Sequence, residues 1–456
     1  MNKLVGRISR HRRYINSGAV LPQDAINDGV LTFDVIEGKL KQIRVHGLGR
    51  LNQAYVVDRL IADPEAPLNM DSLRERFQLL LVDPLFERLN ARVMPDARAG
   101  EAILEIDAVR ARPYQVTLLA NNYRPPSIGA NAIGLSAWVR NLTGYGDMLE
   151  ASVQRASQDK DGNRGNLAWS MPLNQRGAQL SIQLEHGRSA VIEEPVNALS
   201  VKSTLDSKDV GLSQSFIESL TSKLTMGINR VERVNRTFLL DQPYSFVSRE
   251  PDGVTRISAW RFWQEYTDRS QSQVMALRST FTRVNNNLQE IAGLPPSNTQ
   301  AARRYVLWVG QAQYARQVLD NGAQIVLRSN LQYSPHHLLA HDQMSIGGVA
   351  SVRGYRENQL NRDRGALLNA EFEYPLANSA GLHLMLIPFF DYARAKNLDE
   401  SADTLSSIGI ASRFQWRGLS LDVAVAKRLS YPNSINKNGG SLQDKGVHFQ
   451  LAYKFF

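Results

Sequence analysis

The 456-residue chain contains no cysteine, which excludes disulfide frameworks, thiolate metal sites and cysteine nucleophiles together. Long apolar runs are also missing. The longest, Leu79 to Val82 and Leu384 to Phe390, fall far short of the roughly 18 apolar residues that a membrane helix needs. No phosphate-binding loop of the pattern G-x-x-x-x-G-K-[ST] occurs either, so nothing in the chain predicts nucleotide chemistry.

Charge of one sign is not concentrated in any segment. The 53 basic and 44 acidic residues are interspersed, although the net charge is +9. No arginine-rich arm with interleaved aromatics, helix-turn-helix or zinc knuckle is present, so we do not expect a nucleic-acid partner. Charged turns and a charged, water-filled interior explain the composition more simply.

The sequence contains few patterns typical of a catalytic or metal-binding site. His336, His337 and His341 crowd one segment, but adjacent histidines on a loop without a carboxylate are a poor metal site, and we interpret them as rim residues. No G-x-S-x-G elbow or H-E-x-x-H helix occurs. The sequence therefore predicts no enzyme, no metal and no cofactor, while an outer-membrane lipase or protease stays open as an unsupported alternative.

The chain divides near Pro113, and the part before it mixes helices and strands. Residues 38–112 predict the order βααββ, with strands near 40–45, 87–93 and 102–109, a helix after Asn52 and another opening at Asp71. Ser72 and Glu75 stand at capping-box spacing in this second helix. Residues 1–37 predict a helix containing Leu4, Ile8 and Ile15, then a strand in which Leu31, Phe33 and Val35 alternate.

After Pro113 the hydrophobic period changes to two. For example, Leu368, Ala370, Phe372 and Tyr374 alternate with Asn369, Glu371 and Glu373, so that one face of the strand is apolar and the other is polar. We expect about sixteen strands of roughly ten residues, long enough to cross a bilayer when tilted. They fall near residues 114–122, 131–140, 147–156, 164–172, 177–187, 198–207, 222–233, 253–266, 271–285, 303–316, 322–334, 365–375, 382–395, 403–415, 418–430 and 446–456.

The alternation fits either a soluble sandwich or a membrane barrel, and strand number and length favour the barrel. The fold class is thus mainly β: a 16-stranded antiparallel transmembrane β-barrel over residues 113–456, preceded by small α/β modules. The final strand supports this, because Val447, Phe449, Leu451, Tyr453 and Phe455 form an unbroken apolar face and the chain stops at the aromatic Phe456.

The segment Val352-Arg353-Gly354-Tyr355 is the most specific motif of the chain. A glycine between an arginine and a tyrosine predicts a sharp loop apex with positive φ, from which the guanidinium projects as a five-donor fork. Such a fork needs a fixed carboxylate. Asp391 supplies one, on the same strand face as Phe389, because side chains repeat every second residue.

Together these features resemble the two-partner secretion transporters of the Omp85 superfamily, and the likeness covers nearly the whole chain. Residues 38–112 are similar to one complete periplasmic POTRA module, and residues 1–37 to the C-terminal part of a truncated first one. Asn141-Leu142-Thr143-Gly144-Tyr145-Gly146-Asp147 is a further family-like phrase. Residues 1–7 contain no apolar leader region, so we expect either an upstream start or a truncated copy.

The resemblance implies a transporter in the bacterial outer membrane, with its POTRA modules in the periplasm. It would capture a large unfolded exoprotein, such as an adhesin, haemolysin or contact-dependent toxin, by the partner's N-terminal domain and thread it through the barrel without ATP. Other implied partners are outer-membrane lipid and the barrel-assembly machinery, which would read the aromatic C-terminal strand as its signal. Barrel insertion or passive porin-like passage is the alternative.

The resemblance also implies that a loop at about residues 335–364 folds back into the lumen as a tether or partial plug. We predict a bond between Arg353 and Asp391 worth about 1–3 kcal/mol, with Phe389 and Tyr355 packed around it. An exposed edge strand of the POTRA module would add the incoming chain as a further strand. Our candidate is the strand containing Glu87, Leu89, Ala91 and Val93.

Overall fold

The computed structural model describes residues 18–20, 26–27, 30–36, 39–61, 69–98, 100–159, 161–247, 249–289, 301–431 and 440–455. The chain forms two compact units. The first consists of residues 1–114 with 139–148 and 171–177, and the second of the remainder. No helix of the described residues is both long enough and apolar enough to span a bilayer.

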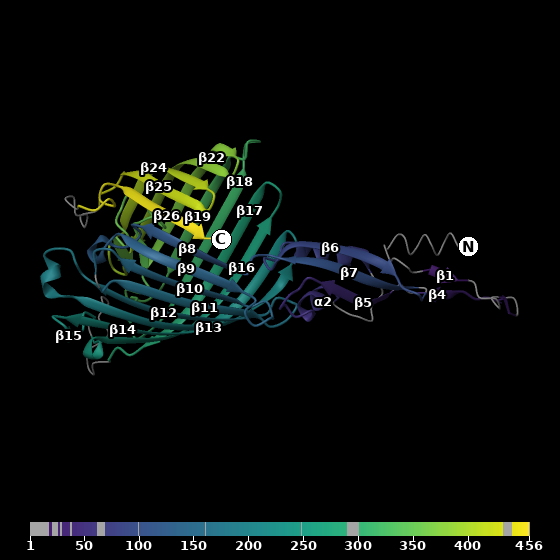
Figure 1. Ribbon diagram of the computed structural model, residues 1–456. Helices are drawn as coiled ribbons and strands as arrows, with labels where there is room; N and C mark the ends of the chain where they lie inside the picture. Colours follow the sequence, from purple (N-terminus) through teal and green to yellow (C-terminus); the bar gives the residue numbers. More distant parts are fainter. Residues whose placement is uncertain are drawn as a thin grey trace. The chain divides into compact units, whose positions relative to one another are not determined.

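The first unit contains the predicted βααββ domain (Figure 1). Its elements are β5 (Lys39–His46), α2 (Ala54–Leu60), α3 (Met70–Leu81), β6 (Phe86–Pro95) and β7 (Glu101–Arg110). The sheet order is β5-β7-β6, with β5 parallel and β6 antiparallel to the central β7. The helices bury Val56 and Leu80 in one cluster with Leu104 and Ile106 of β7, so the domain has a core of its own.

The predicted capping box of α3 is wrong. The helix begins at Met70, one turn earlier than Ser72 and Glu75 require, and the Asn69 side chain accepts hydrogen bonds from the backbone N–H groups of Asp71 and Ser72. Asparagine is among the best N-cap residues, because its carbonyl oxygen reaches donors that have no partner inside the helix.

The segment before β5 forms two short antiparallel pairs. β1 (Gly18–Val20) pairs with β4 (Asp34–Ile36), and β2 (Ile26–Asn27) pairs with β3 (Val30–Leu31). The single strand predicted through Leu31, Phe33 and Val35 is therefore wrong, since β3 and β4 have different partners. The helix predicted around Ile8 lies outside the described residues.

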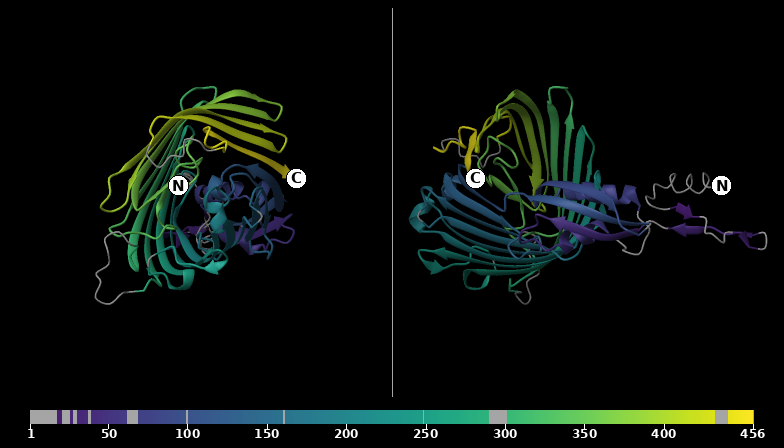
Figure 2. Two further views of the ribbon diagram at one scale, coloured as in Figure 1. Left: turned by 90° about the vertical axis from the view of Figure 1, so that its left-hand side faces the viewer. Right: turned by 45° about the vertical axis from the view of Figure 1, so that its right-hand side comes forward.

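The second part of the chain closes into an antiparallel barrel of sixteen long strands, counted over the described residues, and this confirms the predicted fold class (Figures 1 and 2). Three short 3-10 helices and the two-residue β15 (Gln242–Pro243) lie in its loops. The strands are β8 (Tyr114–Asn121), β9 (Ala132–Arg140), β10 (Met148–Ala156), β11 (Asn163–Pro172), β12 (Gln179–Ala190), β13 (Lys202–Glu218), β14 (Ser222–Leu239), β16 (Val254–Arg269), β17 (Gln273–Asn286), β18 (Arg304–Gln317), β19 (Gln324–Tyr333), β22 (Arg364–Ser379), β23 (Leu382–Lys396), β24 (Asp403–Trp416), β25 (Leu419–Arg428) and β26 (Val447–Phe455).

Because the barrel has an even number of strands, both ends of its chain lie on one rim. β8 begins and β26 finishes at the same end, which we call the near end; the opposite end is the loop end. The closing pair of strands is short. β26 pairs with β8 over six register positions, whereas β13 and β14 share sixteen. At the loop end of this closing pair, Asn122 Nδ2 donates to the Val447 carbonyl at 2.9 Å and Asn122 Oδ1 accepts from Phe449 N at 2.9 Å.

Alternate residues of each strand face opposite sides of the wall. Leu368 and Phe390 are 43% and 40% exposed, whereas Glu371 and Asp391, on the other face of the same strands, are 5% and 0% exposed. In a membrane barrel the exposed apolar face meets lipid and the polar face lines the lumen. The predicted alternation is thus confirmed here, with Glu371 and Asp391 inside.

The sixth predicted strand was misplaced. We expected residues 198–207, but β13 runs from Lys202 to Glu218 and β14 from Ser222 to Leu239, which makes them 17 and 18 residues long. A tilted strand needs only about 9–11 residues to cross a bilayer. The prediction ended at residue 207, where the four consecutive polar residues 206–209 interrupt the period of two, and it missed Val210, Leu212 and Phe216, which continue it on the exposed face.

Candidate functional site

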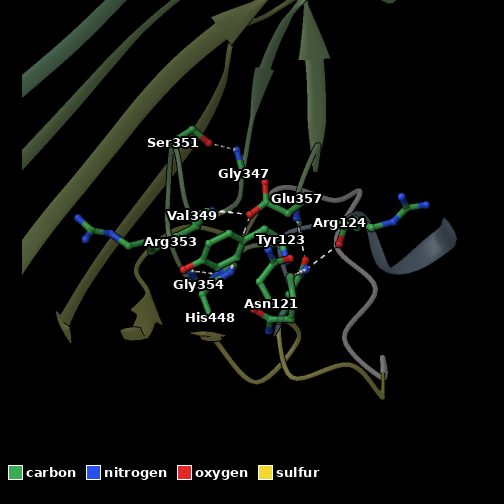
Figure 3. Close-up of polar contacts among 12 residues, drawn as sticks. Asn121, Tyr123, Arg124, Gly347, Val349, Ser351, Arg353, Gly354, Glu357 and His448 are labelled. Carbon is green, nitrogen blue, oxygen red and sulfur yellow. Dashed lines mark hydrogen bonds and ion pairs between the residues drawn. The ribbon is translucent and has the colours of Figure 1, made fainter. Parts of the chain in front are cut away.

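The segment between β19 and β22, residues 334–363, forms a loop hairpin whose tip contacts the inner face of the wall. Its stem pairs β20 (Met344–Ile346) with β21 (Leu360–Arg362). Stem and tip share a buried apolar cluster with the wall residues Leu367, Ala393 and Leu405. The bond between Gly347 N and Ser351 Oγ (2.8 Å) closes the first turn of the tip (Figure 3).

Arg353 lies at the tip, 6% exposed, and binds Asp391 of β23 through three donors. Its Nε and backbone N donate to Asp391 Oδ2 at 2.8 and 3.0 Å, and its Nη2 donates to Oδ1 at 2.8 Å. The guanidinium carbon stands 3.5 Å from the centre of the Phe389 ring. The structure thus brings together Arg353, Asp391 and Phe389, three of the four residues that were predicted to meet here.

Two further wall residues complete the Arg353 site. Glu371 of β22 lies 2.7 Å from Arg353 Nη1 and also pairs with Arg328 at 2.5 Å. Asn369 Nδ2 donates to Asp391 Oδ1 at 2.7 Å and to the Ser351 carbonyl at 2.6 Å. Neither residue was predicted from the sequence, although both belong to the polar face of the predicted strand 365–375.

Gly354 meets the requirement that its position in the motif predicts. Its φ is +93°, and a Cβ there would stand 2.9 Å from the Ala426 Cβ. Its N donates to Nε2 of His448 on β26 at 3.1 Å (Figure 3). Its carbonyl accepts from Arg428 Nε at 2.5 Å. Only glycine combines this φ with such a close approach to the wall.

Tyr355 does not pack around the Arg353–Asp391 pair, and that part of the prediction is wrong. The side chain is fully buried, and its hydroxyl donates toward the carbonyls of Ser430 at 2.6 Å and Ser406 at 2.9 Å. The Arg428 guanidinium lies 5.4 Å from its ring centre. Consecutive residues of a tight turn point in different directions, so Tyr355 reaches the loop ends of β24 and β25 while Arg353 reaches β22 and β23.

Arg356 ties the tip to two loops at the loop end of the barrel. It forms a two-pronged bond to Asp444 at 2.6 and 3.0 Å, and a second ion pair to Glu193 at 2.8 Å. Glu357 follows, with its backbone N donating to Gln443 Oε1 at 2.9 Å and its carboxylate accepting from Val349 N at 2.6 Å. Burial raises the pKa of the Glu357 carboxyl to about 7. This second arginine site was not predicted from the sequence.

The family-like phrase 141–147 forms a tight turn in the first unit. Asn141 has φ +59°, and Thr143 N donates to Asp147 Oδ1 at 2.9 Å. The Gly144 carbonyl accepts from Asn52 N at 2.8 Å. A Cβ on Gly146 would stand 2.3 Å from the Tyr55 ring, so glycine is required there for space as well as for its φ of +80°.

The candidate capture strand β6 is an edge of the small sheet, because it pairs with β7 alone among the described residues. Asp96 N donates to the Glu101 carbonyl at 3.0 Å. In an antiparallel pair such residues alternate, so even-numbered residues of β6 bond to β7. The N–H groups of Leu89, Ala91 and Val93 therefore point to the open side. Ala91 is exposed and Leu89 is buried beneath the sheet.

The last strand carries its apolar residues outward. Phe449, Leu451, Tyr453 and Phe455 share one face of β26, and Val423, Leu421 and Leu419 of β25 stand beside the first three of them. The Tyr453 and Phe455 rings meet edge to face at 4.8 Å between centres. Phe456 lies outside the described residues. The role of this strand as an assembly signal stays a prediction.

The three histidines do not form a metal site. His337 Nδ1 lies 2.8 Å from the buried Asp363 carboxylate, and His341 is exposed. Throughout the part of the chain that the structure describes, no group of three or more His, Cys, Asp or Glu side chains could hold a metal ion. Beside the loop hairpin the lumen keeps a cavity of about 290 Å³, lined by polar side chains that include Glu265, Arg278 and Arg328.

The sequence matches the family model of the haemolysin secretion/activation protein ShlB/FhaC/HecB over residues 100–415. The chain is 21% identical over 448 residues to the outer membrane transporter CdiB of Dickeya dadantii, covering 95% of this chain and 77% of that protein. It is 21% identical over 458 residues to the heme/hemopexin transporter protein HuxB of Haemophilus influenzae, covering 96% of this chain and 78% of HuxB.

Solved structures show the same fold. CdiB from Escherichia coli superimposes with a TM-score of 0.78 at 19% identity, covering all of this chain and 83% of that one. BamA from Haemophilus ducreyi lacking POTRA domains 1–3 superimposes with a TM-score of 0.61 at 12% identity, covering all of this chain and 92% of that one.

Proposed function

This chain belongs to the haemolysin secretion/activation protein family ShlB/FhaC/HecB and is an outer-membrane transporter that secretes exoprotein partners, and we propose that it captures an unfolded partner on β6 (Phe86–Pro95) and threads it through the barrel. The family consists of transporters, not enzymes. The partner in this proposal is a large adhesin, haemolysin or contact-dependent toxin, recognised through its N-terminal domain.

The open edge of β6 supports the capture step. Three N–H groups, of Leu89, Ala91 and Val93, point away from β7 and offer donors to an added strand. Strand addition satisfies the backbone of an unfolded chain without requiring a particular sequence, so one edge suits a long and varied partner. In this scheme residues 38–112 are a complete POTRA module in the periplasm and residues 1–37 part of a preceding one.

The polar lumen supports the threading step. A sixteen-stranded barrel is wide enough to leave an aqueous channel, and the loop hairpin occupies part of it. Arg353 holds this hairpin to β22 and β23, and Arg356 holds it to loops at the other end of its tip. We assign the hairpin the role of a tether that partly closes the path. Passage uses no nucleotide, because the periplasm offers no ATP.

The capture step is tested by Ala91→Pro, assayed by secretion of the exoprotein into the medium and by binding of its N-terminal domain to the purified chain. Proline deletes one N–H on the open side, so we expect binding to weaken about three- to tenfold, the equivalent of one hydrogen bond. Ala91→Thr keeps the N–H and is the matched control, expected to secrete normally.

Normal secretion by Ala91→Pro would remove β6 as the capture edge while leaving the transport function intact. Passive passage is tested separately by bilayer conductance. A threading transporter should show current that the partner's N-terminal domain blocks, whereas a porin-like channel should conduct equally with and without it.

A further inference from the structure

The outer face of β16 to β23 carries a group of cations at the loop end of the barrel, which we call the arginine rim: Arg256, Arg283, Arg304, Arg394 and Lys396. All five side chains are exposed. Their orientation follows from register. Arg283 stands beside Trp260 and Val306, and Arg394 beside Ala366, all on the lipid-facing side of their strands.

Carboxylates are almost missing from this face. Among the outward positions of β16, β17, β18, β19, β22 and β23, the one acid is Asp268, at the near end of β16. On neighbouring β14, Glu232 faces outward and lies 3.5 Å from Arg230. Within the described residues the arginine rim forms no ion pair with a carboxylate. Without a carboxylate partner on this face, these side chains are available to bind an anion from outside the protein.

An apolar groove of about 330 Å³ lies on the same outer face, between the middle of the wall and its near end. Its floor is made of small residues, Ser279, Gly310 and Ala312, which lie side by side on β17 and β18. Larger side chains, Tyr266, Leu277, Trp308 and Leu331, also line it. Ser279 is four residues from Arg283, about 13 Å along the strand at ~3.3 Å per residue.

Trp308 shapes the groove. Its indole Nε1 donates to Ser279 Oγ at 3.0 Å, and a Cβ on Gly310 would stand 2.7 Å from its ring. The ring therefore lies flat against the wall over Gly310. A flat indole leaves the groove open to lipid, where an acyl chain is the one kind of molecule present at this depth.

We propose that this surface binds one phosphorylated glycolipid of the outer leaflet, with its phosphates on the arginine rim and one acyl chain in the groove. Arginine suits phosphate because its planar fork donates two parallel hydrogen bonds. The assignment to the outer leaflet rests on the proposed function: with residues 38–112 in the periplasm, the near end, where both chain ends of the barrel lie, faces the periplasm and the loop end lies at the outer leaflet. The site is independent of the exoprotein and of the loop hairpin.

The test is native mass spectrometry of the full chain in neutral detergent, titrated with diphosphoryl lipid A. We expect one tightly retained lipid. Arg283→Gln with Arg304→Gln should weaken binding about 25-fold, since each cation near an anionic lipid contributes about fivefold. Ala312→Phe fills the groove and should weaken binding about tenfold, because displacing two methylenes accounts for that much.

Arg316→Gln is the matched control. Arg316 is an exposed, outward-facing residue of β18, like Arg304, but lies at the near end. Its replacement should leave binding unchanged, and an equal loss there would show unspecific attraction and overturn the proposal. Equal affinity for lipid A stripped of both phosphates, wild-type affinity in the Arg283/Arg304 variant, or displacement of the lipid by millimolar inorganic phosphate would each overturn it too.

Discussion

Replacing Arg353 with alanine should release the loop hairpin from the wall without preventing the barrel from forming. The substitution removes the partner of two carboxylates that cannot reach water, since Asp391 is 0% and Glu371 5% exposed. Breaking a buried ion pair by deleting one member costs about 3–5 kcal/mol, because the remaining charge stays buried. This exceeds the 1–3 kcal/mol expected from the sequence, which assumed a partly wet site.

The lack of native cysteine provides the assay. Val352 is fully buried beside Arg353, so Val352→Cys places a single thiol that reacts with a water-soluble maleimide when the tip leaves the wall. In this background Arg353→Ala should raise the labelling rate at least about 100-fold, as a loss of 3 kcal/mol implies. Arg353→Lys, which keeps the charge and loses the fork, should fall between. Arg316→Ala, on the outer face, is the control.

The same variants measure the role in transport. Arg353→Ala should reach the membrane as a folded barrel, shown by its gel mobility before and after heating, and should secrete less exoprotein. An unchanged labelling rate would refute the energetic reasoning. A raised rate with normal secretion would refute only the functional role of Arg353.

Two more predictions use the same thiol reporter. Arg356→Gln should raise the labelling rate about tenfold, because it loses charge-assisted bonds to Asp444 and Glu193. Asp444→Asn should have a smaller effect. Equal rates in these two variants and in the parent Val352→Cys protein would show that these bonds do not hold the tip. The raised pKa of Glu357 means that the docked tip binds more protons than the free tip between pH 4.5 and 7, so docking is strongest below pH 4.5 and weakens, by at most about 3 kcal/mol, as pH rises through 7. The labelling rate of the Val352→Cys thiol, divided by that of an exposed Ala350→Cys thiol, should therefore rise between pH 4.5 and 7. Glu357→Gln should abolish this pH dependence. If the dependence persists in Glu357→Gln, it comes from another group, such as the neighbouring His448.

The wall strands could be predicted where apolar and polar residues alternate without a break. Phe372 and Glu371 alternate because one side of β22 meets hydrocarbon and the other meets water. In β13 the four consecutive polar residues 206–209 interrupt the alternation, so the predicted strand ended at residue 207 and missed the outward-facing Val210, Leu212 and Phe216. The α3 cap was missed for a related reason, since Asn69 looks like any loop residue until the helix start is known.

The site residues, too, could be predicted from the sequence only in part. Arg353 and Asp391 stand in motifs whose spacing is local, and both could be nominated from the sequence. Arg356 directly follows the motif, yet its partners Asp444 and Glu193 are 88 and 163 residues away, and no pattern links them. The direction of Tyr355 could not be predicted either, because it depends on the φ of Gly354 and on the wall that the turn approaches.

The short closing pair has a mechanical consequence for a cylinder that must admit a polypeptide. Resistance to stretching around the circumference scales with the number of backbone bonds across each junction, so the junction of first and last strands yields before any of its longer neighbours. The Asn122 amide, which bonds to Val447 and Phe449 beyond the last paired residues, reinforces that weakest line at one end only. Distension of the barrel would therefore start from the unreinforced near end and progress toward the loop end.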